Sequence, residues 1–374
     1  MEKHKIKNFA HSIKLNKEII MIVIIICIAS ILFVGCDTAN ITGEVSSEET
    51  LKVGAILGFS GPGAFYTESI VKGMNIAIYD LRKKGIDIEI IYEDGKTNAV
   101  DSVSSFNKLK DIDDVDMVIS LFAVSTVPLV PLAEDAKIPI LTSINSAKNI
   151  AGSSYVLQYY LAAENYAYPI AKKVSDDGHD KVLIIYVNDE YGKSVKDAFV
   201  SKYDGDVVIE SFIVSDMDYK TILSKVDSDV DAIVFGGFKP HYVNILKNMK
   251  ELNIELPFYE MSPNTMYPSV VSQSESEGVI GVSLEFAING DSDFETKYFA
   301  EYNEKPDVAA SLGYDMIQII GQSTKGKSSD HIVEDIVSMR TFTGLNGITK
   351  ITNDGRFIFP TEIVQVKSSR LVVN

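Results

Sequence analysis

The chain has little cysteine, little histidine and no tryptophan: two cysteines and five histidines occur in 374 residues. Both cysteines, Cys27 and Cys36, lie near the N-terminus, so residues 37–374 cannot form an internal disulfide. The histidines beyond the N-terminal region are far apart in sequence and far from any cysteine, which excludes the usual zinc-binding spacings. Stability must therefore come from burial and packing, and the sequence predicts no metal ion or other cofactor.

Enzyme motifs are also lacking. The segment Gly192-Lys193-Ser194 ends like a phosphate-binding loop, but that motif requires another glycine at position 187, which is Val187. The segment beginning at Gly58 lacks the second glycine of a serine-hydrolase elbow, because position 62 is Pro62. We therefore interpret the chain as a protein that performs no chemistry. An enzyme is kept as an alternative, since catalytic groups can assemble from distant positions.

Positive charge is scarce outside the first 36 residues. The whole chain has a net charge of −17, whereas residues 1–36 contain five lysines and two glutamates, so the remainder has a net charge of −20. Nucleic-acid binding depends on Lys and Arg side chains that neutralise phosphates. Nucleic acid is therefore excluded as a partner.

Only one long hydrophobic run is present. Residues 19–35 are apolar or glycine except for Ser30, and the run follows the lysines and ends at Cys36. This layout is typical of an export signal. The sequence 32–36 (LFVGC) resembles a bacterial lipobox, although Phe33 stands where leucine is usual, and it predicts lipidation of Cys36. The alternative is an uncleaved transmembrane anchor, for which roughly 17 to 25 residues are needed. Both place the rest of the chain outside the cytoplasm, at the membrane.

From residue 51 onward, short β-branched runs alternate with segments of helical periodicity. This alternation predicts βαβ units, in which helices cover both faces of a parallel sheet. The expected strands of the first series are 51–57, 87–92, 117–121 and 138–142, and the expected helices lie near 70–81, 98–110 and 126–136.

A second series of the same kind follows a polar stretch at 143–154, and the predicted class is α/β with two doubly wound lobes. Its expected strands are 181–187, 207–213, 231–235, 257–261 and 279–283, with helices near 165–175, 191–203, 219–226 and 241–252. The C-terminal region adds helices near 294–302, 309–324 and 332–339, and then a hairpin in which 348–351 and 362–366 flank Asp354-Gly355.

Ligands of open α/β sheets bind at the carboxyl ends of the strands. The loop that follows the first strand, 58–66, combines glycines with aromatic residues, as a loop that contacts a ligand would. An equally consistent interpretation is a long turn with Tyr66 packed in the core.

Four segments, taken together, resemble the leucine/isoleucine/valine-binding family, which comprises type I periplasmic binding proteins of ABC importers. The resemblance covers nearly all of residues 51–374. The matching segments are Phe59–Pro62 continuing to Tyr66, Leu132–Ile140 leading to Thr142, Asn188–Gly192, and Phe235–Phe238.

The resemblance implies the type I periplasmic-binding fold, with two Rossmann-like lobes joined by three crossovers. Each lobe would then consist of separate segments. The implied organisation is a signal or anchor at 1–36, a flexible tether at 37–50, lobe 1 at 51–163 plus 287–342, and lobe 2 at 164–286 plus 343–374.

The resemblance also implies a ligand site between the lobes. Family members hold the ligand carboxylate with a serine whose position here is Ala123, and they hold an ammonium with an acid whose position here is Asn264. Carboxylate capture would then depend on backbone N–H groups and neighbouring hydroxyls. The complete implied set of ligand-binding residues is Tyr66, Ala123, Ser125, Thr126, Ile144, Ser146, Tyr191, Phe238 and Asn264, and Glu260, Asp189 or Glu190 are alternative sources of negative charge.

The function implied is that of an extracytoplasmic solute-binding lipoprotein. It would close on a small polar or carboxylated solute, such as an amino-acid-like molecule or an amide, and deliver it to the permease subunits of an ABC importer. A ligand-sensing receptor domain with the same cleft is the other alternative.

Overall fold

The computed structural model describes residues 50–145, 150, 153–263, 267–328 and 330–374. Predictions that concern the signal, Cys36, the tether, Ser146 and Asn264 therefore fall outside the described residues. Residues 49–374 form one compact unit.

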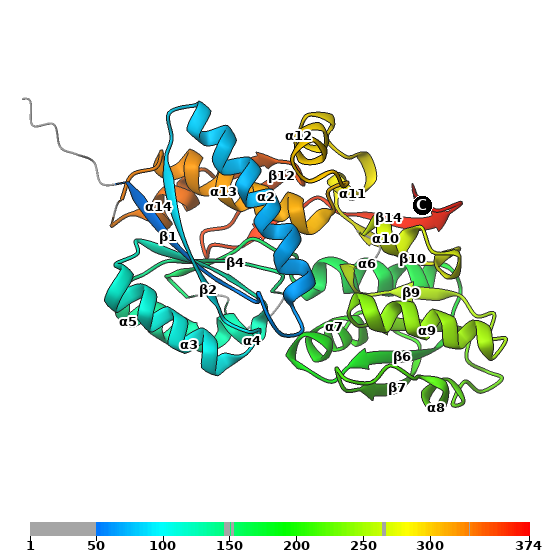
Figure 1. Ribbon diagram of the computed structural model, residues 1–374. Helices are drawn as coiled ribbons and strands as arrows, with labels where there is room; N and C mark the ends of the chain where they lie inside the picture. Colours follow the sequence, from blue (N-terminus) through cyan, green and yellow to red (C-terminus); the bar gives the residue numbers. More distant parts are fainter. Residues whose placement is uncertain (1–49, 146–149, 151–152, 264–266, 329) are drawn as a thin grey trace, which may run out of the picture. The chain divides into compact units, whose positions relative to one another are not determined.

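The first sheet is parallel throughout and has the order β2-β1-β3-β4-β5 (Figure 1). Its residues alternate between two cores: Val53 and Ala55 pack on one face, whereas Ile56 joins Val118 on the other. Helices α2, α13 and α14 cover the first face and α3 and α5 the second. The strands are β1 (Leu51–Leu57), β2 (Ile88–Asp94), β3 (Met117–Leu121), β4 (Ile140–Ser143) and β5 (Val156–Gln158). The helices are α2 (Ala64–Lys83), α3 (Ala99–Lys108), α4 (Ala123–Thr126), α5 (Val130–Ala136), α13 (Val308–Thr324) and α14 (Ile332–Ser338).

The second sheet has the order β15-β14-β10-β9-β8-β6-β7. Strands β6 to β10 are mutually parallel where they pair, whereas β14 and β15 are antiparallel to their neighbours. The strands are β6 (Lys181–Val187), β7 (Asp206–Phe212), β8 (Ala232–Gly236), β9 (Phe258–Glu260), β10 (Ile280–Ser283), β14 (Glu362–Lys367) and β15 (Arg370–Val373). The helices of this region are α6 (Ala163–Asp176), α7 (Glu190–Val200), α8 (Lys220–Leu223), α9 (Lys239–Glu251) and α10 (Pro268–Val271). The predicted α/β class is confirmed.

Helices α2 and α13 lie in very close contact because glycine occurs where their backbones meet. A Cβ atom on Gly73 would lie 1.9 Å from the carbonyl oxygen of Ala310, and one on Gly313 would lie 2.2 Å from that of Ile70. Only a residue without a side chain permits this approach. The chain therefore returns, after β10 of the second sheet, to complete the helical layer over the first sheet. Short helices α11 (Glu285–Asn289) and α12 (Ser292–Tyr302) lead back to it.

The predicted C-terminal strands exist, but their pairing with each other as a hairpin is wrong. Gly355 does turn the chain, with φ +77°, but the strand that returns to pair with β12 (Gly347–Ile351) is the two-residue β13 (Phe357–Ile358). Pro360 follows, and proline has no N–H to continue a ladder. The segment predicted as the second hairpin strand is β14, which pairs with β10 and β15 instead. Strand β12 belongs to a separate three-stranded sheet with β13 and β11 (Thr341–Gly344).

Candidate ligand-binding site

A cavity of about 520 Å³ lies where the carboxyl ends of both sheets' strands face one another. Residues that follow β1 to β5 line one side, and residues that follow β6 to β9 line the other. This is the position expected for a ligand of an open α/β sheet. Most of the described lining residues are apolar or aromatic, and none of them is Lys or Arg.

Five of the residues predicted from the resemblance line this cavity: Tyr66, Ala123, Ile144, Tyr191 and Phe238. The structure therefore brings together side chains that are up to 172 positions apart in sequence. Their role as ligand contacts stays a prediction.

Ser125 and Thr126 are buried and do not line the cavity. The Thr126 hydroxyl lies 2.9 Å from that of Ser120 and 3.0 Å from that of Thr142, at the ends of β3 and β4. These hydroxyl contacts attach the last residue of α4 to the two strands. In the described structure, the Thr126 hydroxyl therefore faces Ser120 and Thr142 and not the cavity.

Aromatic rings form walls on both sides of the cavity. Tyr191 and Phe238 are stacked, with ring centroids 5.3 Å apart and an interplanar angle of 20°. On the other side, Tyr66 lies 6.0 Å from Phe122. These rings supply large rigid apolar surfaces on both sides of the cavity.

Two bulky lining residues have positive φ angles: Phe122 at 66° and Ile144 at 48°. Such angles are strained for bulky and β-branched side chains, at a cost of order 1–3 kcal/mol each. Both residues directly follow strands, β3 and β4, where the chain must turn sharply away from the sheet. The Phe122 ring also fills the space beside Gly63, where an added Cβ would lie 2.5 Å from it.

The acidic residues near the cavity differ in their environment. The Asp189 carboxylate accepts a hydrogen bond from the Gly192 N–H at 2.8 Å and caps α7, and burial raises its pKa. Glu190 is exposed and lies 3.7 Å from Lys193. Glu260, at the end of β9, is fully buried.

Glu260 influences the pKa of two tyrosines that line the cavity. Burial raises the pKa of Tyr66 and of Tyr191, and the negative charge of Glu260 raises both further. The buried Glu260 carboxyl group therefore lies close enough to the tyrosines of the cavity wall to influence their pKa. Neutral tyrosine hydroxyls are the form present at physiological pH.

Sequence reasoning missed several lining residues, among them Phe122, Tyr160 and Val214. Each follows the end of a strand: β3, β5 and β7 respectively. The rule that ligands meet strand carboxyl ends was therefore the usable signal. It failed for Tyr160 because β5 has only three residues and was not recognised as a strand.

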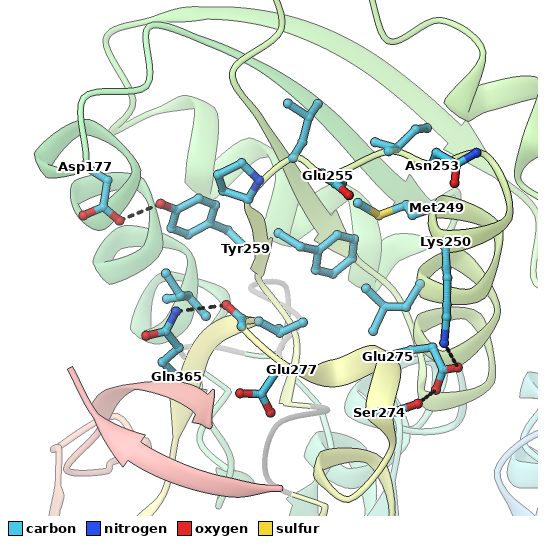
Figure 2. A pocket seen from close by; sticks show the side chains of 18 of the residues that line it. Asp177, Met249, Lys250, Asn253, Glu255, Tyr259, Ser274, Glu275, Glu277 and Gln365 are labelled. Atoms are coloured by element: carbon cyan, nitrogen blue, oxygen red, sulfur yellow. Dashed lines mark hydrogen bonds and ion pairs between the residues drawn. The ribbon is translucent and has the colours of Figure 1, made fainter. Parts of the chain in front are cut away.

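A second, more open groove of about 830 Å³ lies at the opposite end of the second sheet (Figure 2). Its polar groups mostly bond to one another. The Tyr259 hydroxyl donates to Asp177 at 2.5 Å, Lys250 pairs with Glu275 at 3.3 Å, and Gln365 donates to the Gly278 carbonyl at 3.1 Å. None of the predicted ligand residues that the structure describes lines this groove.

Residues 50–370 match the model of a periplasmic binding protein family. The chain belongs to the periplasmic binding protein family. Members of this family are extracytoplasmic binding proteins. Among the residues that the structure describes, no helix combines the length and the apolar character that crossing a membrane requires.

Solved structures of periplasmic binding proteins share the fold at low sequence identity. The branched-chain amino acid transporter substrate-binding protein LivJ from Streptococcus pneumoniae, solved with isoleucine, is 22% identical with a TM-score of 0.78, and the match covers 87% of this chain and 100% of that one. The leucine-binding protein LivK from Thermotoga maritima is 20% identical with a TM-score of 0.77, covering 87% and 97%. An ABC transporter solute-binding protein from R. palustris, solved with benzoate, is 17% identical with a TM-score of 0.76, covering 87% and 95%.

Proposed function

We propose that this periplasmic binding protein captures a small solute between its two sheets and delivers it to the permease subunits of an ABC importer, without chemical turnover. The observation that carries the proposal is the 520 Å³ cavity lined by Tyr66 on one side and by Tyr191 and Phe238 on the other. A volume in the range of about 300–1,000 Å³ suits a small ligand. The fold neighbours that bind isoleucine or benzoate support the same assignment.

The solute is an amide, another neutral polar molecule or an aromatic acid, in preference to leucine, isoleucine or valine. Ala123 offers no hydroxyl to a carboxylate, and Asn264 offers no charge to an ammonium. Hydrogen bonds to charged groups contribute about 1.5–3 kcal/mol, compared with about 1 kcal/mol for neutral pairs. Losing two charged contacts would weaken amino-acid binding by roughly 10- to 1000-fold. The stacked pair Tyr191 and Phe238 favours a planar ligand instead.

A thermal-shift panel tests this proposal. Leucine, isoleucine and valine are compared with benzamide, benzoate and short aliphatic amides on the wild-type protein. A solute at a hundredfold excess over its Kd stabilises the folded state by about 2.7 kcal/mol, which gives a clear melting shift. We expect at least one amide or aromatic acid to give this shift and leucine to give none.

Variants make the panel specific to the cavity. Tyr66→Ala and Phe238→Ala should abolish the shift, whereas Tyr79→Ala should retain it, because Tyr79 is 55% exposed on α2 and does not line the cavity. Calorimetry that shows sub-micromolar leucine binding to the wild type would overturn the solute preference. It would mean that an acid such as Glu260 or Glu190 holds the ammonium.

We further infer that the protein is held at the outer face of the membrane by a lipid on Cys36. The support is the sequence layout, in which lysines, an apolar run and Gly35 precede the cysteine. Metabolic labelling with a fatty acid should mark the wild type and not Cys36→Ser. Equal labelling of both proteins would contradict lipidation, and an unprocessed but membrane-bound wild type would favour the uncleaved anchor.

A further inference from the structure

Lys239 connects elements of the two sheets beside the cavity. It is the first residue of α9, which follows β8 of the second sheet after Gly237 and Phe238. Its ammonium nitrogen lies 5.6 Å from the ring centroid of Phe65, which belongs to α2 and therefore to the first sheet's layer. The same nitrogen lies 5.8 Å from the ring of Tyr267. Both distances are within the range of a cation–π interaction, about 6 Å.

Two electrostatic interactions also link Lys239 to the first sheet's layer. The Lys239 backbone lies near the hydroxyl of Tyr66, the next residue after Phe65, and counteracts part of the rise in the pKa of that hydroxyl. The positive charge of Lys239 also reaches Asp307, the N-cap of α13, whose carboxylate accepts from the Ala310 N–H at 3.0 Å. Because α13 packs directly on α2, these groups belong to one rigid helix pair.

Lys239 is not one of the residues that line the cavity, although its neighbour Phe238 is. Tyr267, whose ring lies near the ammonium, is 5.7 Å from the ring of Tyr66 in the cavity wall. The lysine therefore bridges α9 to the α2–α13 pair without occupying the space available to a solute.

We propose that Lys239 is a closure latch: a positioning residue that stabilises the closed arrangement of the two sheets and thereby sets how much of the ligand-free protein is closed. The inference rests on the proposed function, because it assumes that the sheets move apart to admit a solute. The contact of Lys239 with the Phe65 ring and its electrostatic interactions with Tyr66 and Asp307 exist only while the sheets are together. They stabilise the closed state alone, and such a differential contact shifts the equilibrium.

The size of the expected effect follows from the strength of the cation–π interaction. Lys239 is partly exposed, and cation–π contacts at such sites are weak but measurable. Removing the charge should reduce the ratio of closed to open molecules about 2- to 10-fold. The affinity for any solute that requires closure falls by a similar factor when the closed state is the minor one.

The test uses the full chain without any solute. Cys27 and Cys36 are replaced by serine, and spin labels are attached at Ile112→Cys and Ile209→Cys, which are exposed positions (74% and 42%) on the first and second sheet's sides. Pulsed electron-spin distance measurements then give the closed fraction. Lys239→Met removes the charge and keeps the apolar stem, whereas Lys239→Arg keeps a cation over the rings as the matched control.

We expect Lys239→Met to shift the distance distribution toward the open state and Lys239→Arg to resemble the wild type. Phe65→Leu should reproduce the shift, and the double variant should add little to it, because both changes remove the same contact. A melting midpoint close to that of the wild type excludes general unfolding. The latch would be overturned if Lys239→Met and the wild type gave the same distribution of spin-label distances. This includes the case in which both proteins show one and the same distance. If no solute in the thermal-shift panel stabilises the protein, that result counts against the proposed function. The spin-label distances are measured without solute, so they test the latch separately.

Discussion

Tyr191 combines two properties that are rarely found together in a folded protein. Its ring is stacked on Phe238 in the cavity wall, and its hydroxyl is buried with no partner of hydrogen-bond geometry among the described residues, although the nearby Ser262 side chain counteracts part of the rise in its pKa. An unsatisfied buried hydroxyl costs about 1–3 kcal/mol. The Tyr191 hydroxyl therefore lowers the stability of the ligand-free protein relative to a ring without the hydroxyl.

Replacing Tyr191 by phenylalanine should therefore not reduce the free energy of unfolding of the ligand-free protein, and should raise it by up to about 1 kcal/mol. Tyr219→Phe is the matched control, because its hydroxyl donates to the Asp216 carbonyl at 2.7 Å. That variant should lose about 1 kcal/mol. Urea unfolding measures both changes. If Tyr191→Phe costs as much as Tyr219→Phe, the hydroxyl is already satisfied in the ligand-free protein.

Elements with a strong local pattern could be predicted from the sequence. The buried run at 181–187 is β6 with the bounds expected, because a β-branched segment between polar turns has few other options. The helix expected near 309–324 is α13, whose apolar residues surround it on nearly all sides. The first helix of the tail, expected at 294–302, begins two residues earlier, since Asp291 caps it by accepting from the Phe294 N–H.

Elements that depend on distant partners could not be predicted. Strand β5 has three residues, and its existence depends on pairing with β4 in the assembled sheet. Likewise, nothing local distinguishes β14 from a hairpin strand, because its partner β10 is about 80 residues earlier in the chain. The candidate site likewise contains residues that could be predicted from the sequence and residues that could not. Aromatic wall residues such as Phe238 were found through the family resemblance, whereas Tyr160 becomes visible only once β5 is placed.

At the scale of the whole molecule, packing of the buried core contributes more to stability than charge pairs on the surface do. Both sheets and most helices share one continuous cluster of buried apolar residues. Most ion pairs are exposed, and such pairs contribute about 0–1 kcal/mol each. A partly buried exception is Lys297 with Asp80, at 2.8 Å, where the aspartate side chain is only 10% exposed. Residues 37–374, with a net charge of −20, therefore tolerate their negative charge because the core, not the surface, provides the stability.

The central claim is that the two sheets close on a solute held between them. Small-angle neutron scattering of the full chain tests this claim most directly. Because we propose a membrane anchor, the protein is kept in detergent, and the solvent contrast is set so that the detergent does not contribute to the scattering. The protein is measured alone and with a saturating amount of the solute that gives the largest melting shift. We predict a smaller radius of gyration for the complex, because closure brings the two sheets together around the cavity. Scattering curves that superimpose with and without the bound solute would contradict the account.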